Sequence, residues 1–212
     1  MDSKIFKLKG KTLAIIDWAN VYGWRGKLKW KIEPQKLYNY LKTYPEIFDI
    51  RFYFGVEKRN EKSEKFQQRI KDIGYSLISK EVKWVPVSLD KSHFKDLLQE
   101  LVAISDDLKN SNSKISNQIK ELLNAPIYRR KCDFDCEIVM DIMRNINDFD
   151  GMILFSGDGD YKAIAEYLLE NKKQVIIVHP FGLRGREYNE LLLKDANRPY
   201  FCAVEKLTPF LK

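Results

Sequence analysis

The chain has 212 residues, of which 44% are hydrophobic and 32% are charged, a composition typical of a soluble globular protein and not of a disordered one. Its longest apolar runs are only as long as strands, which excludes a membrane-spanning helix. The net charge of +7 favours polyanionic partners such as RNA or DNA, although a well-solvated lysine-rich surface would give the same value.

The first part of the chain alternates between strand and helix patterns. In chain order, these patterns predict a strand at 12–20, a helix at 34–44, a strand at 49–56, a helix at 57–74 and extended segments at 75–80 and 81–88. Pro34 is suited to open the first helix, and Gly74 is suited to end the second. Pro86 makes the last extended segment an edge or connecting piece.

Residues 89–128 differ from the rest of the chain. They show two amphipathic helical patterns separated by a polar turn, and no glycine occurs between Gly74 and Gly151. We interpret this stretch as a helical insertion in a single domain that spans residues 1–212. The insertion can contact a partner or a second copy of the chain, so a homodimer remains open.

The last part of the chain returns to alternation. The patterns predict a helix at 132–146, a strand at 150–158, a helix at 160–173, a strand at 174–180, a helix at 185–196 and a strand at 197–204. Short apolar strands that alternate with helices indicate an α/β fold with a mostly parallel sheet covered on both faces. Ligands gather at the carboxyl ends of such strands, so we expect Asp17, Ser156, Asp158 and Asp160 to converge there.

Asp17 directly follows an apolar run, in IIDWAN. A desolvated carboxylate must be paired, hydrogen-bonded or bound to a metal to stay charged. Asn20, three residues later, is placed to cap the following turn or to touch a ligand. A simple Asx turn at the end of the strand explains Asp17 equally well.

The helix predicted at 132–146 begins with acidic residues. One of Asp133 and Asp135 is explained as a helix cap. Asp141 is not, because it lies among apolar residues and is an i, i+4 neighbour of Glu137, a like-charge pair that a purely structural helix would avoid.

The turn SGDGD (156–160) carries two carboxylates at the end of a predicted buried strand. A helix cap explains one of them but not both. Together with Asp17 and with Asp135 or Asp141, Asp158 and Asp160 would form an acidic pocket, which is costly unless a cation joins it. We expect Asp158 to be a direct ligand and Asp160 a second ligand or a water-mediated contact.

Oxygen ligands without His or Cys select Mg²⁺ or Mn²⁺. The chain has only two histidines, and its three cysteines show no paired CxxC motif, so zinc and a His-dependent triad are disfavoured. The odd cysteine count and the absence of a secretory signal in the N-terminal residues favour reduced thiols and the cytoplasm. An acidic metal pocket on a basic protein is the layout expected of an enzyme that cleaves phosphodiester bonds.

Three stretches, IIDWANVYG, KCDFDCEIVMDIM and ILFSGDGDYKAIAEYLLENKKQVIIV, together resemble the NYN domain, the LabA/DUF88-like group related to PIN-domain nucleases. They occur in the order of the family and place residues 10–57 and 129–204 on its pattern. The resemblance implies a PIN-like Rossmannoid three-layer sandwich and a metal-dependent ribonuclease site. It carries over the positions of Asp17, Asn20, Asp135, Asp141, Ser156, Asp158 and Asp160, and it places Lys131 near a position that is often basic.

Basic residues in this pattern can hold the rest of a single-stranded RNA substrate. The candidates are Arg129, Arg130, Lys131, Lys162, Arg184 and Arg186, with the loop at 181–189 the strongest because it follows a strand near the pocket. The four tryptophans are expected to be packing residues rather than platforms for bases.

Two other functions remain. A haloacid-dehalogenase phosphatase also has an Asp after its first strand and a GDG turn, but the second Asp that it needs is replaced by Ala19, and Lys162 stands where its later motif requires a carboxylate. A module that binds RNA or a protein on the same fold, without turnover, is the stronger alternative.

Overall fold

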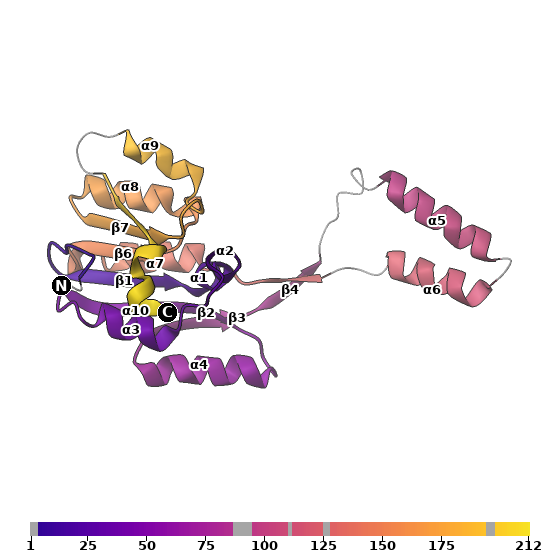
Figure 1. The fold of residues 1–212 in the computed structure, drawn as a ribbon, viewed down its shortest axis with the longest axis horizontal. Helices are drawn as coiled ribbons and strands as arrows, with labels where there is room; N and C mark the ends of the chain where they lie inside the picture. The colour runs from indigo at the N-terminus through magenta and orange to yellow at the C-terminus, as the bar shows by residue number, and fades with distance from the viewer. Residues whose placement is uncertain (1–3, 87–94, 110–111, 125–127, 194–197) are drawn as a thin grey trace. The chain divides into compact units, whose positions relative to one another are not determined.

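The computed structural model describes residues 4–86, 95–109, 112–124, 128–193 and 198–212 (Figure 1). It divides into two compact units. The first consists of residues 1–81 and 132–212, and the second of residues 82–131. Within the described ranges, no helix is long and apolar enough to cross a membrane.

The first unit is built on a six-stranded parallel sheet in the order β3-β2-β1-β6-β7-β8. The strands are β1 (Thr12–Asp17), β2 (Ile47–Val56), β3 (Ser76–Glu81), β6 (Gly151–Phe155), β7 (Gln174–His179) and β8 (Tyr200–Ala203). β1 and β6 are central neighbours, paired in register from Thr12 with Gly151 to Ile16 with Phe155. The segment expected to be extended at 75–80 therefore forms an edge strand of the main sheet.

Helices cover both faces of this sheet (Figure 1). They are α1 (Trp18–Gly23), α2 (Arg25–Leu28), α3 (Pro34–Leu41), α4 (Glu61–Ile73), α7 (Asp135–Arg144), α8 (Lys162–Glu170), α9 (Asn189–Leu192) and α10 (Thr208–Leu211). Short 3₁₀ turns occur at Ile146–Asp148, Gly159–Tyr161, Arg186–Tyr188 and Val204–Leu207. The predicted three-layer α/β fold is confirmed.

Alternation along β1 creates two separate cores. Ala14 and Ile16 point to the face covered by α1, α3, α4 and α10, whereas Leu13 and Ile15 point to the face covered by α7 and α8. All six residues of β1 are buried, as expected for the centre of a parallel sheet. The apolar run of the predicted strand ended at Asp17, as β1 does, but the short helix α1 that follows it was not predicted.

The second unit contains an antiparallel pair, β4 (Lys83–Pro86) and β5 (Tyr128–Lys131), and two helices, α5 (Lys95–Lys109) and α6 (Ser113–Asn124). α5 and α6 are linked by the buried hydroxyl of Ser105, which donates to the carbonyl oxygen of Ser116 at 3.0 Å. These helices lie in the range predicted as a helical insertion, parts of which (89–94, 110–111 and 125–127) lie outside the described residues.

Candidate carboxylate site

The carboxyl ends of β1 and β6 bring two distant polar segments together. Asp17 is the last residue of β1, and Ser156 directly follows β6. The Ser156 hydroxyl donates to Asp17 Oδ2 at 3.1 Å, across 139 positions of sequence. The expected convergence of these two segments at one edge of the sheet is thus observed.

Asp17 is a buried carboxylate, with only 8% of its surface exposed. Its Oδ1 accepts the backbone N–H of Asn20 at 3.3 Å, so Asp17 is also the cap of α1. Burial raises its pKa from 3.8 to about 6; the bonds from Asn20 and Ser156 oppose this shift, and the negative charges of Asp135 and Asp158 add to it. The environment of Asp17 therefore favours a proton or a cation.

Asn20 ties α1 to the SGDGD turn. Its Oδ1 accepts the indole N–H of Trp24 at 2.7 Å and the backbone N–H of Gly157 at 3.2 Å. Asn20 therefore supports the turn through its side chain while its backbone holds Asp17.

The SGDGD turn is held by its own side chains and by one tyrosine. The backbone N–H of Asp158 donates to Ser156 Oγ at 3.2 Å, and that of Asp160 donates to Asp158 Oδ1 at 3.1 Å. The hydroxyl of Tyr188 donates to the carbonyl oxygen of Asp158 at 2.8 Å. Asp158 is thus the residue that caps the 3₁₀ turn, and Asp160 is exposed.

Asp135 joins the same electrostatic group from the start of α7. Tyr161 donates its hydroxyl to Asp135 Oδ1 at 2.8 Å. Burial raises the pKa of Asp135, and the charges of Asp158, Asp133 and Asp160 add to the effect. Sequence reasoning missed the two tyrosine hydroxyls that fix this site, because an aromatic residue in an apolar pattern carries no sign of a distant polar partner.

Asp141 has different partners. Its Oδ2 accepts the hydroxyl of Tyr53 at 2.5 Å and lies 3.6 Å from the guanidinium of Arg51, which is also bound by Asp49 at 2.8 Å. Six residues along a helix place Asp141 about 9 Å from Asp135 along the axis, too far for one small cation to bridge both. The role of Asp141 as a metal ligand stays a prediction, and its observed contacts tie α7 to β2.

The basic residues predicted to bind substrate lie in three environments. Lys162 lies on α8, and its ammonium group forms ion pairs with Glu166 and Glu190, both at 2.9 Å. Arg184 donates to Asn189 Oδ1 at 2.8 Å and stacks over Phe201, whereas Arg186 is exposed. Arg129, Arg130 and Lys131 form β5 in the second unit.

A cavity beside the carboxylates is lined by Arg184 and Arg186 together with Asn20, Gly157 and Asp158. Its walls require glycine. A Cβ on Gly157 would lie 2.2 Å from the carbonyl oxygen of Leu183, and a Cβ on Gly185 would lie 2.5 Å from Gly159 Cα. The glycines therefore allow the SGDGD turn and the loop at 181–187 to touch backbone to backbone.

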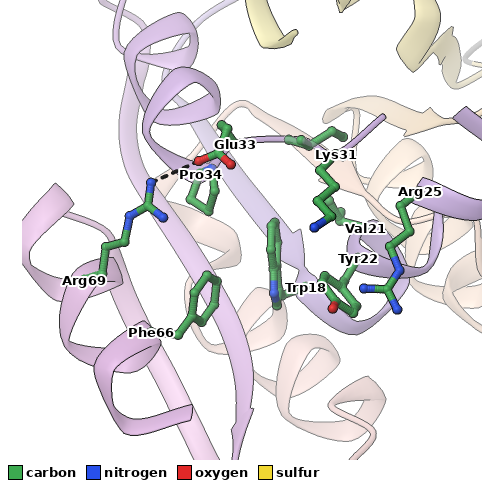
Figure 2. Close-up of a pocket in the computed structure, with 10 residues that line it drawn as sticks. Trp18, Val21, Tyr22, Arg25, Lys31, Glu33, Pro34, Phe66 and Arg69 are labelled. Atoms are coloured by element: carbon green, nitrogen blue, oxygen red, sulfur yellow. Dashed lines mark hydrogen bonds and ion pairs between the residues drawn. The ribbon is translucent and has the colours of Figure 1, made fainter. Parts of the chain in front are cut away.

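A second cavity, of about 140 Å³, is lined by another set of α1 side chains, together with α4 and residues 31–34 (Figure 2). Its centre is Trp18, which stacks on Phe66 with ring centroids 5.5 Å apart. The guanidinium of Arg25 lies 3.9 Å from the centroid of the Tyr22 ring. The Trp18–Phe66 contact packs α1, which follows Asp17, onto α4, and the Arg25–Tyr22 contact joins α2 to α1.

No group of three or more His, Cys, Asp or Glu side chains within the described ranges is arranged to hold a metal ion. The donor set nevertheless suits a hard cation. Only oxygen atoms are present, and Asp17 is a buried carboxylate whose neighbours add negative charge. Mg²⁺ is usually held by one or two carboxylates and several waters, so a complete protein cage is not required.

The protein is similar to two proteins over nearly its full length. The Low amplitude and bright protein LabA of Synechococcus elongatus is 24% identical over 201 residues, which cover 92% of this chain and 90% of that protein. The crystal structure of a protein of unknown function from Vibrio parahaemolyticus superposes with a TM-score of 0.59 at 18% identity, covering 98% of this chain and 100% of that chain. The second likeness shows the fold alone.

The model of the NYN domain matches residues 90–196, half of the 212-residue chain. The matched segment contains Asp135 and the SGDGD turn, and the fold brings Asp17 to it from outside that segment. The chain belongs to the NYN domain family.

Proposed function

We propose that this protein is a metal-dependent nuclease that hydrolyses phosphodiester bonds of single-stranded RNA. The observation that carries the proposal is the group formed by Asp17, Asp135 and Asp158, in which the charges of Asp135 and Asp158 raise the pKa of Asp17 and the charge of Asp158 raises the pKa of Asp135. Membership of the NYN family supports the same class of activity. Asp160, exposed at the end of the SGDGD turn, completes the proposed set of metal-binding carboxylates.

Mg²⁺ or Mn²⁺ would be held by Asp17 together with Asp135 or Asp158, with waters in the remaining positions. When bound, the cation would lower the pKa of a coordinated water and neutralise charge on the phosphate. Ser156 and Asn20 hold Asp17, and Tyr161 holds Asp135, so the carboxylates are positioned before substrate arrives. Arg186, and Arg184 at the rim of the same cavity, would bind phosphates that flank the scissile bond.

The decisive experiment is cleavage of labelled single-stranded RNA and DNA in Mg²⁺, Mn²⁺ or EDTA. The test variant is Asp17→Asn/Asp158→Asn, and the matched control is Asp148→Asn, an exposed aspartate on the turn after α7. We expect cleavage by the wild type and the control in metal, and none in EDTA or by the double variant. Cleavage that survives in the double variant would come from a contaminant and would refute the proposal.

One observation favours a second candidate, a module that binds RNA without cleaving it. The described carboxylates do not form a ready-made metal cage. Binding of RNA in every metal without cleavage would support this alternative. Hydrolysis of p-nitrophenyl phosphate without cleavage of RNA would instead indicate a phosphatase.

A further inference from the structure

The antiparallel ribbon of β4 and β5 in the second unit has two chemically different faces. Its register pairs Trp84 with Arg130 and Pro86 with Tyr128, and it pairs Lys83 with Lys131 and Val85 with Arg129. Paired residues share a face, and successive residues alternate between faces. One face therefore carries Trp84, Tyr128 and Arg130, and the other carries Lys83, Arg129 and Lys131.

The ribbon brings several basic side chains and two exposed aromatic side chains together. Two lysines stand directly opposite each other, an arrangement that is destabilising in an antiparallel pair. Half of the eight ribbon residues are basic, and none is acidic. Trp84 is 60% exposed and Tyr128 is 52% exposed. Large aromatic rings beside cations are the groups that bind unstacked bases and their phosphates.

We propose that this ribbon is a binding surface for single-stranded nucleic acid, made of other residues than the carboxylate site. Bases stack on Trp84 and Tyr128, with the Arg130 guanidinium beside them, while phosphates are bound by Lys83, Arg129 and Lys131. Single strands fit the surface because bases in a duplex keep their flat faces stacked against each other. The inference rests on the proposed function for the choice of RNA, but binding by the ribbon requires no cleavage.

The test measures binding of labelled oligouridylate to the full chain in EDTA, at several salt concentrations. We expect Trp84→Ala and Tyr128→Ala each to weaken binding at least about fivefold with an unchanged salt dependence. Lys83→Ala/Lys131→Ala should reduce the slope of log K against log salt by about 1.4, because two phosphate contacts are lost. The matched controls are Tyr167→Ala on α8 and Lys62→Ala/Lys71→Ala on α4, which should bind as the wild type does.

Tryptophan emission gives a second, independent measurement. Trp18 and Trp24 are buried and Trp30 is half-buried, so quenching by stacked bases should come mainly from the exposed Trp84. Trp84→Phe keeps an aromatic ring and should retain affinity while losing most of the quenching. This variant also separates a loss of stacking from a loss of folding.

The proposal for the ribbon would be overturned if both aromatic variants bound oligouridylate with wild-type affinity, or if Tyr167→Ala lost as much affinity as they do. It would also be overturned if the wild type bound duplex RNA or polyglutamate as tightly as oligouridylate. Equal binding of polyglutamate would indicate an acidic protein partner. The nuclease proposal fails separately. RNA bound through the ribbon but not cleaved in Mn²⁺ refutes only the enzyme, and cleavage with unchanged binding in the ribbon variants refutes only the ribbon.

Discussion

At the scale of single residues, Asp17 combines a structural and a chemical role. It caps α1 through Asn20 and accepts the Ser156 hydroxyl, so it joins three segments. Yet burial raises its pKa to about 6, which means that its charged form is unfavourable in the folded protein without a cation. At neutral pH this buried carboxylate therefore lowers the stability of the folded protein, a cost that the proposed cation would offset.

This cost predicts how stability changes with pH. Between pH 3.8 and about 6, the folded state binds the proton of Asp17 more tightly than the unfolded state does, so the free energy of unfolding falls as pH rises through this window. Asp17→Asn removes the effect. At pH 7.5 without metal, we expect the variant to be more stable than the wild type by up to about 3 kcal/mol, with the gap closing below pH 4. Urea unfolding at several pH values measures this difference.

Added Mn²⁺ provides the control for that prediction. It should raise the melting temperature of the wild type and leave Asp17→Asn unchanged. A gap that does not depend on pH would contradict the assignment of the buried charge to Asp17.

The two aspartates on α7 should respond in opposite ways to the same substitution. Asp141→Asn weakens the bonds from Tyr53 and Arg51 and should lower the free energy of unfolding by about 1–2 kcal/mol while cleavage continues. Asp135→Asn removes a charge from a repulsive group, so stability should be kept and cleavage lost. Parallel urea unfolding and cleavage assays test both. Loss of cleavage in Asp141→Asn with intact stability would restore Asp141 to the metal-binding set.

At the scale of elements, the site depends on contact between the SGDGD turn and the loop at 181–187. Gly157 and Gly159 both face this loop, but they meet different atoms. A Cβ on Gly157 meets the backbone oxygen of Leu183 at 2.2 Å, and one on Gly159 meets the end of the exposed Glu187 side chain at 1.8 Å. Backbone cannot move aside as easily as a flexible side chain can.

We therefore expect Gly157→Ala to lower the free energy of unfolding by about 1–3 kcal/mol, and Gly159→Ala to lower it by less. Adding Glu187→Ala should rescue Gly159→Ala but not Gly157→Ala. Urea unfolding of the two single and two double variants measures both effects. Equal losses in the single variants, or rescue of Gly157→Ala, would show that the turn packs differently.

At the scale of the whole molecule, the second unit is inserted between β3 and α7. The two ends of the first unit at this insertion are close, because Cys132 Sγ lies 4.0 Å from the carbonyl oxygen of Lys80. The Lys80 ammonium also pairs with Glu137 on α7 at 2.6 Å. The two chain ends that flank residues 82–131 therefore lie close together within the first unit, so a short linker is long enough to join them.

We expect a protein in which a short Gly-Ser linker replaces residues 82–131 to fold cooperatively. Shortening a loop lowers its closure entropy slowly, by about 0.6 kcal/mol for each halving of length, so stability should stay equal or rise slightly. Circular dichroism and urea unfolding measure this. The excised protein should also bind oligouridylate more weakly, because the ribbon is gone. Loss of cooperative unfolding would show that the second unit supports the sheet.

Local patterns were sufficient for the strands of the main sheet and for its longer helices, though not for α1, and they singled out the carboxylates at the strand ends. The buried runs at β1, β2, β6 and β7 were visible because strands in a parallel sheet are apolar on both faces. Asp17 and the SGDGD turn were recognised as candidate site residues because a charge at the end of a buried strand is costly unless it has a partner. The order of elements then placed them at one edge of the sheet.

The partners of each side chain could not be read from the sequence. From the sequence, Asp141 had no visible partner and was therefore predicted to bind a metal. Its partners Arg51 and Tyr53 lie about 90 positions earlier and contact it only after β2 and α7 pack together. Trp84 was expected to be a packing residue and is exposed on the ribbon. The sequence by itself determined which residues carry charge and where strands end. Only the tertiary structure decided which charges share a site, because burial and pairing depend on contacts between segments far apart in the chain.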